Sequence, residues 1–308
     1  MKRVFRNAED ELRLIWIWLI GIAVYYAIHS LFARLYMWGL MSVVNADSMT
    51  PTMMAFSDLL FQLPIAALTI IAFAILHRKL LHEPMLIRPR PLLIGCGAML
   101  ACIAGAVLLL TVMGKLRIVP AMDGWAEDYG EYVLVTAVYA LITIIMAMTS
   151  VIFRYCFLCG SALKRLDRRA ALLVCLLLFG LLSVLGGSGE VIAKLNNVLF
   201  VALLLLALDV GGAGACCGVL LGQCLGLSVL FGSQSSAYVL TRIVPTSVEA
   251  TIAPAVRDPL TGGSAGARES LWLMGVFALM IVIALLCNAS VRERLWGYAK
   301  RVILGGMQ

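Results

Sequence analysis

Residues 197–231 have the sequence NVLFVALLLLALDVGGAGACCGVLLGQCLGLSVLF, in which Asp209 is the only charged residue. A helix needs about 20 apolar residues to cross the hydrocarbon core of a bilayer, so this stretch is too long for a single crossing. The glycine-rich link 211–214 divides it near the middle. We therefore predict two spans, 197–210 and 214–231, with the link acting as a tight turn or as a site of close helix packing.

The composition of the whole chain supports a membrane environment. Of its 308 residues, 62% are hydrophobic and 13% are charged, whereas soluble domains have roughly 45–50% apolar and about 25% charged residues. The mean hydropathy is +1.00. One soluble core of this size cannot bury so many apolar residues, so we predict an all-α fold, a polytopic integral membrane bundle.

The apolar runs predict about eight transmembrane helices. In chain order, the expected spans are 14–37, 58–76, 91–113, 132–153, 171–186, 197–210, 214–231 and 271–287. They form one membrane domain, 14–288. Segment 232–269 is rich in proline and glycine, which favour turns, and it is expected to be an outer loop.

Basic residues alternate along the chain in a way that predicts topology. Segment 1–13, the loops after the second and fourth spans, and the tail 289–308 together hold 17 of the 24 Lys and Arg residues. The positive-inside rule places these segments in the cytoplasm. We expect a multi-pass protein of the cell membrane with both termini cytoplasmic. The basic residues lie between apolar runs, which points to a lipid bilayer as partner and not to nucleic acid.

Ionisable residues within membrane helices are costly, so each is a functional candidate. The polar candidates for a cavity between the helices are His29, Arg154, Asp209 and Glu190. His29 is interpreted mainly as a hydrogen-bonded core histidine. The CxxC pair Cys156 and Cys159 adjoins a membrane helix without a strand pattern, which favours packing over a redox or zinc site.

Three short stretches have the spacing of motifs that occur together in a known family of membrane proteins. They are Thr149-Ser150-Val151-Ile152-Phe153-Arg154, Phe179-Gly180-Leu181-Leu182-Ser183 and Gly222-Gln223-Cys224-Leu225-Gly226-Leu227. Over roughly residues 60–290, with a core at about 130–232, the chain resembles the CAAX protease and bacteriocin-processing family of intramembrane metalloproteases. That family has an eight-helix bundle with the motifs Glu-Glu-x-x-x-Arg, Phe-x-x-x-His and His-x-x-x-Asn or Asp. Its Glu and His side chains hold a metal or activate a water.

This chain keeps the spacing of these motifs but lacks their catalytic side chains. Thr149 and Ser150 occupy the two Glu positions, Ser183 occupies the first His position, and Gly222 or Gln223 occupies the second. Neutral hydroxyls cannot serve as a general base at neutral pH, and a serine is a poor metal ligand compared with imidazole. We therefore predict no catalytic residue and no metal site.

Phe153, Arg154 and Phe179 match the family motifs, and two further expectations follow from them. Arg154 is expected to be a polar anchor in the former active-site cavity, paired with Asp209, or else a basic residue at the cytoplasmic end of its span. If the family frame is correct, Arg154, Ser183 and Gln223 should converge on one cavity.

Three functions are compatible with these observations. The first is a catalytically inactive, protease-like membrane scaffold or regulator of another membrane protein, without a cofactor. The second is an active membrane metallo-endopeptidase whose unconventional ligands include Glu190, His29 and Asp209, in which case zinc is expected. The third is a small transporter or permease subunit with a path near the broken helix at 211–214. A helical membrane protein that matches the family frame by coincidence is a fourth interpretation.

Overall fold

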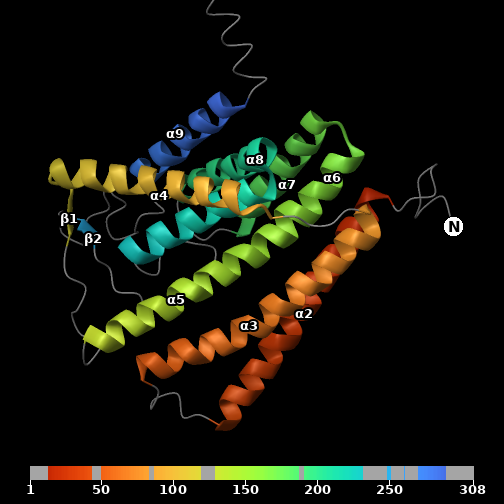
Figure 1. Cartoon of the computed structure of the whole chain (residues 1–308), viewed down its shortest axis with the longest axis horizontal. Coiled ribbons are helices and arrows are strands. Elements are labelled where there is room, and N and C mark those ends of the chain that lie inside the picture. Colours follow the sequence, from red (N-terminus) through yellow and green to blue (C-terminus); the bar gives the residue numbers. More distant parts are fainter. Residues whose placement is uncertain are drawn as a thin grey trace, which may run out of the picture.

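The computed structural model describes residues 13–43, 50–82, 87–118, 129–186, 191–231, 248–250, 260 and 270–288. Long helices dominate these residues and pack into a bundle (Figure 1). The helices are α2 (Leu14–Val43), α3 (Pro51–Leu76), α4 (Pro89–Val112), α5 (Tyr129–Ser150), α6 (Gly160–Arg165), α7 (Arg168–Gly186), α8 (Val191–Phe231) and α9 (Leu271–Cys287), with π-helical segments η2 (His77–Leu81) and η3 (Val151–Cys159). The predicted fold class, a helical polytopic membrane bundle, is confirmed.

Two short strands accompany the helices. Strand β1 (Leu116–Ile118) pairs antiparallel with β2 (Val248–Ala250), with Leu116 opposite Ala250. The pairing joins the segment after α4 to the predicted outer loop 232–269. Apart from 248–250 and residue 260, that loop lies outside the described residues, as do segments 1–12 and 289–308.

Six of the described helices are long and apolar enough to cross a membrane, and α9 is a shorter apolar helix of 17 residues. Helix α8 has 41 residues. A straight helix of that length would extend for about 60 Å, twice the hydrocarbon thickness of about 30 Å. Its backbone breaks at Gly212, where φ is +70° and ψ is −165°. The break divides α8 into the segments 191–211 and 213–231, so the predicted number of about eight crossings stays a prediction.

The chain reverses direction at this break. Helix α7 and the first half of α8 form an antiparallel hairpin, because a short link joins them at one end and Arg168 pairs with Asp209 at the other. The second half starts beside the beginning of α4, where Gly214 lies against Arg88, and then follows α4 along its length. The predicted turn and the predicted close packing at 211–214 are both present.

Glycines spaced four residues apart bring the second half of α8 against α4. A Cβ on Gly218 would overlap the carbonyl oxygen of Leu92, and one on Gly222 would lie 2.7 Å from the carbonyl oxygen of Cys96. Small residues at this spacing let two helix backbones touch. The contact face of α8 is made by Gly214, Gly218, Gly222 and Gly226.

Helices α5, η3 and α6 run continuously and carry the centre of the core. Eight of the nine residues of η3 are buried, and Phe157 has no exposed surface. Helix α2 is anchored to this central helix by the indole of Trp18, which donates to the Leu158 carbonyl (3.0 Å) and the Ser161 hydroxyl (2.9 Å). Buried polar groups need such partners in the interior.

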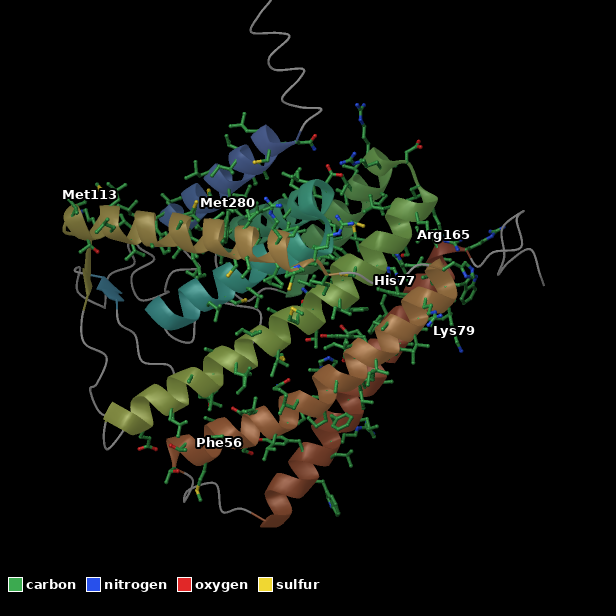
Figure 2. All side chains as sticks on the ribbon, in the orientation of Figure 1. Phe56, His77, Lys79, Met113, Arg165 and Met280 are labelled. Atoms are coloured by element: carbon green, nitrogen blue, oxygen red, sulfur yellow. The ribbon has the colours of Figure 1, made fainter. Side chains whose placement is uncertain are left out.

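Basic side chains gather where α3 and α6 end and α4 and α7 begin, and we call this region the basic end. Lys164 donates to the Leu81 carbonyl there. Arg165, His77 and Lys79 lie on this side of the bundle, whereas Met113 and Phe56 lie on the far side (Figure 2). The segment after α4, on the far side, also carries two basic residues, Lys115 and Arg117, so the described loops do not separate strictly by charge.

Two predicted helix starts were wrong. Helix α3 begins at Pro51 and not at residue 58, because the Thr50 hydroxyl accepts a hydrogen bond from the Met53 amide (3.3 Å) and proline suits the first helical position. Helix α8 begins at Val191 and not at 197. Because α3 starts earlier, Asp58 lies inside the helix.

The glycine contact predicts a specific loss of stability. Gly218→Ala is expected to lower the free energy of unfolding by about 1–3 kcal/mol, because the added methyl group must displace the α4 backbone. Thermal unfolding of the purified chain in detergent measures the effect. Gly97→Ala on α4 is the matched control, since nothing lies within 4 Å of its Cβ position. Equal melting temperatures for the two variants would contradict this packing.

Candidate functional site

The first motif lies at the junction of α5 and η3. Thr149 and Ser150 are both buried, and the Thr149 hydroxyl donates to the Met146 carbonyl of its own helix (2.9 Å). Arg154 is exposed. Its neighbour Phe153 stacks on the ring of Tyr25 from α2, with ring centroids 4.1 Å apart. The first of the two hydroxyls is therefore engaged by its own helix.

The other two motifs lie on α7 and α8. The Ser183 hydroxyl donates to the Phe179 carbonyl (2.7 Å), and the buried Phe179 ring meets Tyr155 edge-on, with ring centroids 5.8 Å apart. Gln223 is buried on α8 and accepts a weak hydrogen bond from the Cys224 thiol (3.6 Å). Arg154 is exposed whereas Gln223 is buried. No observed contact joins Arg154, Ser183 and Gln223 within the described residues, so their convergence on one cavity stays a prediction.

The glycines of the third motif are held in the α4–α8 contact. A Cβ on Gly222 would lie 2.8 Å from the Met99 Cβ, and one on Gly226 would lie 2.9 Å from Ile103 Cδ1. A histidine at 222 therefore has no space unless the two helices separate. Of the two positions that the resemblance assigns to this histidine, 222 and 223, the first is a site of helix packing.

His29 lies half-buried on α2, beside Tyr25. Its ring packs against Tyr25, with centroids 4.2 Å apart, and its buried Nε2 has no hydrogen-bond partner within the described part of the chain. The prediction of a hydrogen-bonded histidine is thus not met at Nε2 and stays a prediction for Nδ1. Glu190 lies outside the described residues.

The cysteine pair agrees with the packing interpretation. Cys156 and Cys159 are buried, and the Cys159 side chain is hydrogen-bonded with that of Cys175 on α7. Among the residues that the structure covers, no group of three or more His, Cys, Asp or Glu side chains is placed to hold a metal ion.

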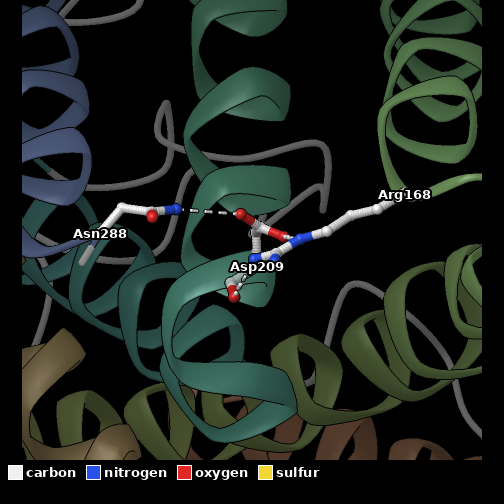
Figure 3. A network of polar contacts seen from close by, with 3 residues as sticks. All are labelled: Arg168, Asp209 and Asn288. Atoms are coloured by element: carbon white, nitrogen blue, oxygen red, sulfur yellow. Dashed lines mark hydrogen bonds and ion pairs between the residues drawn. The ribbon is translucent and has the colours of Figure 1, made fainter. Parts of the chain in front are cut away.

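Asp209 is the centre of a polar network at the basic end (Figure 3). Arg168 Nε donates to Asp209 Oδ1, and Arg168 Nη2 donates to the Asp209 carbonyl (3.3 Å). Asn288, just after α9, donates through Nδ2 to Oδ2 (3.3 Å). Asp209 was expected to pair with Arg154, but Arg168 lies at this carboxylate, because the α7–α8 hairpin brings residues 41 positions apart side by side.

A cavity of about 450 Å³ adjoins this network. It is lined by Arg88, Pro91 and residues 210–214, and so lies at the break of α8 and the start of α4. The predicted link 211–214 therefore forms the wall of a cavity as well as a turn. Arg88 was predicted as a loop residue that sets topology, and nothing in the sequence placed it beside this link.

No protein-family model, curated protein or solved structure matches this chain.

Asp58 is a half-buried carboxylate within α3 that was not predicted as a site residue. Its carboxylate accepts hydrogen bonds from Tyr139 of α5 (3.2 Å) and Tyr36 of α2 (3.4 Å), and Tyr36 also contacts the Ser57 hydroxyl (3.0 Å). The cluster ties α2, α3 and α5 together away from the basic end. Because the predicted second span began at Asp58, the residue was placed at the membrane edge and not within a helix.

The Asp209 network makes a testable prediction about stability. Arg168→Ala is expected to destabilise the fold by about 1–3 kcal/mol, because it leaves a carboxylate with a 10% exposed side chain short of a donor. The double variant Arg168→Ala/Asp209→Ala should lose less than the sum of the single variants, since contacting residues are coupled. Melting temperatures in detergent test this. Arg169→Ala, an exposed neighbour, is the control, and strict additivity would exclude the coupling.

Proposed function

We propose that this chain is a catalytically inactive, protease-like membrane protein that acts as a scaffold or regulator of another membrane protein. The observation that carries the proposal is the packing at Gly222. Gly222 is one of the two positions, with Gln223, at which the family frame expects a histidine, and the backbone and Met99 side chain of α4 occupy the space that a side chain at 222 would need.

The chemistry of the other motif positions supports the same conclusion. Hydrolysis by this family's mechanism needs a carboxylate and imidazoles that converge on one water or metal ion. The hydroxyls of Thr149 and Ser183 instead donate hydrogen bonds to carbonyls one turn away in their own helices. Hydroxyls that are hydrogen-bonded within their own helices are not arranged to activate a water molecule, so a binding role is favoured over bond cleavage.

We also propose an orientation in the cell membrane. The basic end should face the cytoplasm, because Lys and Arg are retained on that side of a bilayer. The start of α2 packs against α6 through Trp18, and Asn288 after α9 meets Asp209, so both described ends of the chain lie at the basic end. The proposal therefore keeps both termini cytoplasmic.

The alternatives receive less support from the geometry. A transporter would hold its substrate near the midplane at a broken helix, whereas the break at Gly212 lies beside Arg88 at the basic end. An active protease with unconventional ligands would need Asp209 for chemistry, and Arg168 and Asn288 already hold that carboxylate.

A cleavage assay tests the absence of catalysis. The full chain, reconstituted in liposomes with added Zn²⁺ or Co²⁺, is expected to cleave a quenched-fluorescence membrane peptide no faster than the Thr149→Ala/Ser150→Ala/Ser183→Ala variant. The variant removes the three hydroxyls that stand at the Glu and first His positions. Metal-dependent cleavage by the wild type that this variant lacks would refute the proposal.

A complementation experiment tests the scaffold role. In the native cell, deletion of the gene should lower the amount of a partner membrane protein, as measured by quantitative proteomics of the membrane fraction. The same triple variant is expected to restore that amount as well as the wild type does. Accumulation of an uncleaved precursor that only the wild type removes would point to a protease instead.

A further inference from the structure

Asp58 is a carboxylate inside α3, within the part of that helix that is long and apolar enough to cross the membrane. Side chains that ionise are costly at such a position unless they are paired. The only Lys or Arg in α2, α3 and α5 is Arg34, which is exposed, and the links 44–49 and 119–128 contain no basic residue. No ion pair to Asp58 is present among the described residues. The neutral, protonated acid is therefore the form that suits this position.

The two hydrogen bonds to this carboxyl group are long for an ionised acceptor. Tyr139 donates to Asp58 Oδ2 over 3.2 Å, and Tyr36 donates to Oδ1 over 3.4 Å. A hydroxyl that donates to a carboxylate usually lies about 2.5–2.7 Å from its oxygen. The Tyr36 hydroxyl also shares a hydrogen bond with the Ser57 hydroxyl (3.0 Å) and is not committed to Asp58. Contacts of this length stabilise a negative charge weakly, which again favours the protonated acid.

A buried acceptor without a donor lies one turn away on the same helix. Gln62 follows Asp58 by four residues, the spacing at which Gln and Asp side chains of one helix can form a hydrogen bond. Its Oε1 atom is buried and has no hydrogen-bond partner within the residues that the structure describes. A buried carbonyl oxygen costs free energy until it accepts a hydrogen bond. A protonated Asp58 carries the O–H donor that an ionised one lacks.

We propose that Asp58 binds a proton and that its new O–H group donates to Gln62 Oε1. Uptake of H⁺ forms one O–H bond and removes the charge of the carboxylate, and release returns the proton to water. Phe56, two residues before Asp58, lies on the far side of the bundle (Figure 2). Nearer the end of α3, Thr52 donates to Glu131 of α5 (2.6 Å), so polar side chains lead from that side toward the half-buried carboxyl group. The site thus responds to pH on the far side, and this assignment does not depend on the scaffold role.

Few other titratable groups face the site, and Asp58 is the only one on α3. Tyr36 on α2 and Tyr139 on α5 contact it, and tyrosines stay protonated at neutral pH. Glu131 lies eight residues before Tyr139, and His29 lies seven residues before Tyr36. Both are about 10–12 Å from the site along the helix axes. A variant at Asp58 therefore separates its titration from theirs.

The first experiment follows the melting temperature of the full chain in neutral detergent against pH. If the folded chain holds a proton that the unfolded chain releases, stability should fall as pH rises above about 5, where an exposed aspartate is ionised. Asp58→Asn has the same shape without the charge, so it should keep the stability of the wild type at low pH and lose this part of the pH dependence. Asp167→Asn, exposed between α6 and α7, is the control and should behave like the wild type. A wild-type pH dependence in Asp58→Asn would overturn the proposal.

Infrared difference spectroscopy detects the bound proton directly and does not depend on stability. At about pH 6, where exposed carboxyl groups are ionised, the wild type should show the carbonyl-stretch band of a protonated carboxylic acid, and Asp58→Asn should lack it. Gln62→Leu removes the acceptor and is expected to weaken proton binding about three- to tenfold, the effect of losing one hydrogen bond. Absence of the band from the wild type, or its persistence in Asp58→Asn, would exclude Asp58 as the site.

Discussion

Direct contact between the backbones of α4 and the second half of α8 constrains much of this structure. In lipid, burial of apolar surface gives helices little reason to associate, so close van der Waals packing must hold them together. Glycines at every fourth position of α8 provide that contact, and the carbonyls of Leu92 and Cys96 fill the space that side chains would take. The core formed by α5, η3 and α6 then packs against this pair.

The reversal at Gly212 depends on the same contact. The first half of α8 returns along α7, and the second half can follow α4 only if the chain turns sharply at the basic end. A glycine with positive φ permits the turn, and the Arg168–Asp209–Asn288 network joins α7, α8 and the end of α9 beside it. The cavity lined by Arg88 results from this turn, because two helices begin there at the same level.

The functional interpretation also depends on packing. Neutral residues at the positions that the resemblance assigns to catalysis favour the proposed loss of activity, but they do not say whether other side chains could reach the same space. At Gly222 the space itself is occupied by α4. The glycines of the third motif are helix contacts, which agrees with the proposed scaffold role.

Much of the fold was predictable from the sequence, because lipid forces backbone polar groups to be satisfied within helices and the apolar runs are therefore long and easy to find. The runs and the link 211–214 predicted eight crossings and a turn. The sequence did not predict that Asp209 meets Arg168, that Arg88 lies beside Gly214, or that Asp58 is enclosed by two tyrosines. These contacts join residues far apart in the chain, and helix periodicity carries no information about which helices become neighbours. Tertiary packing alone decided them, and with them the site.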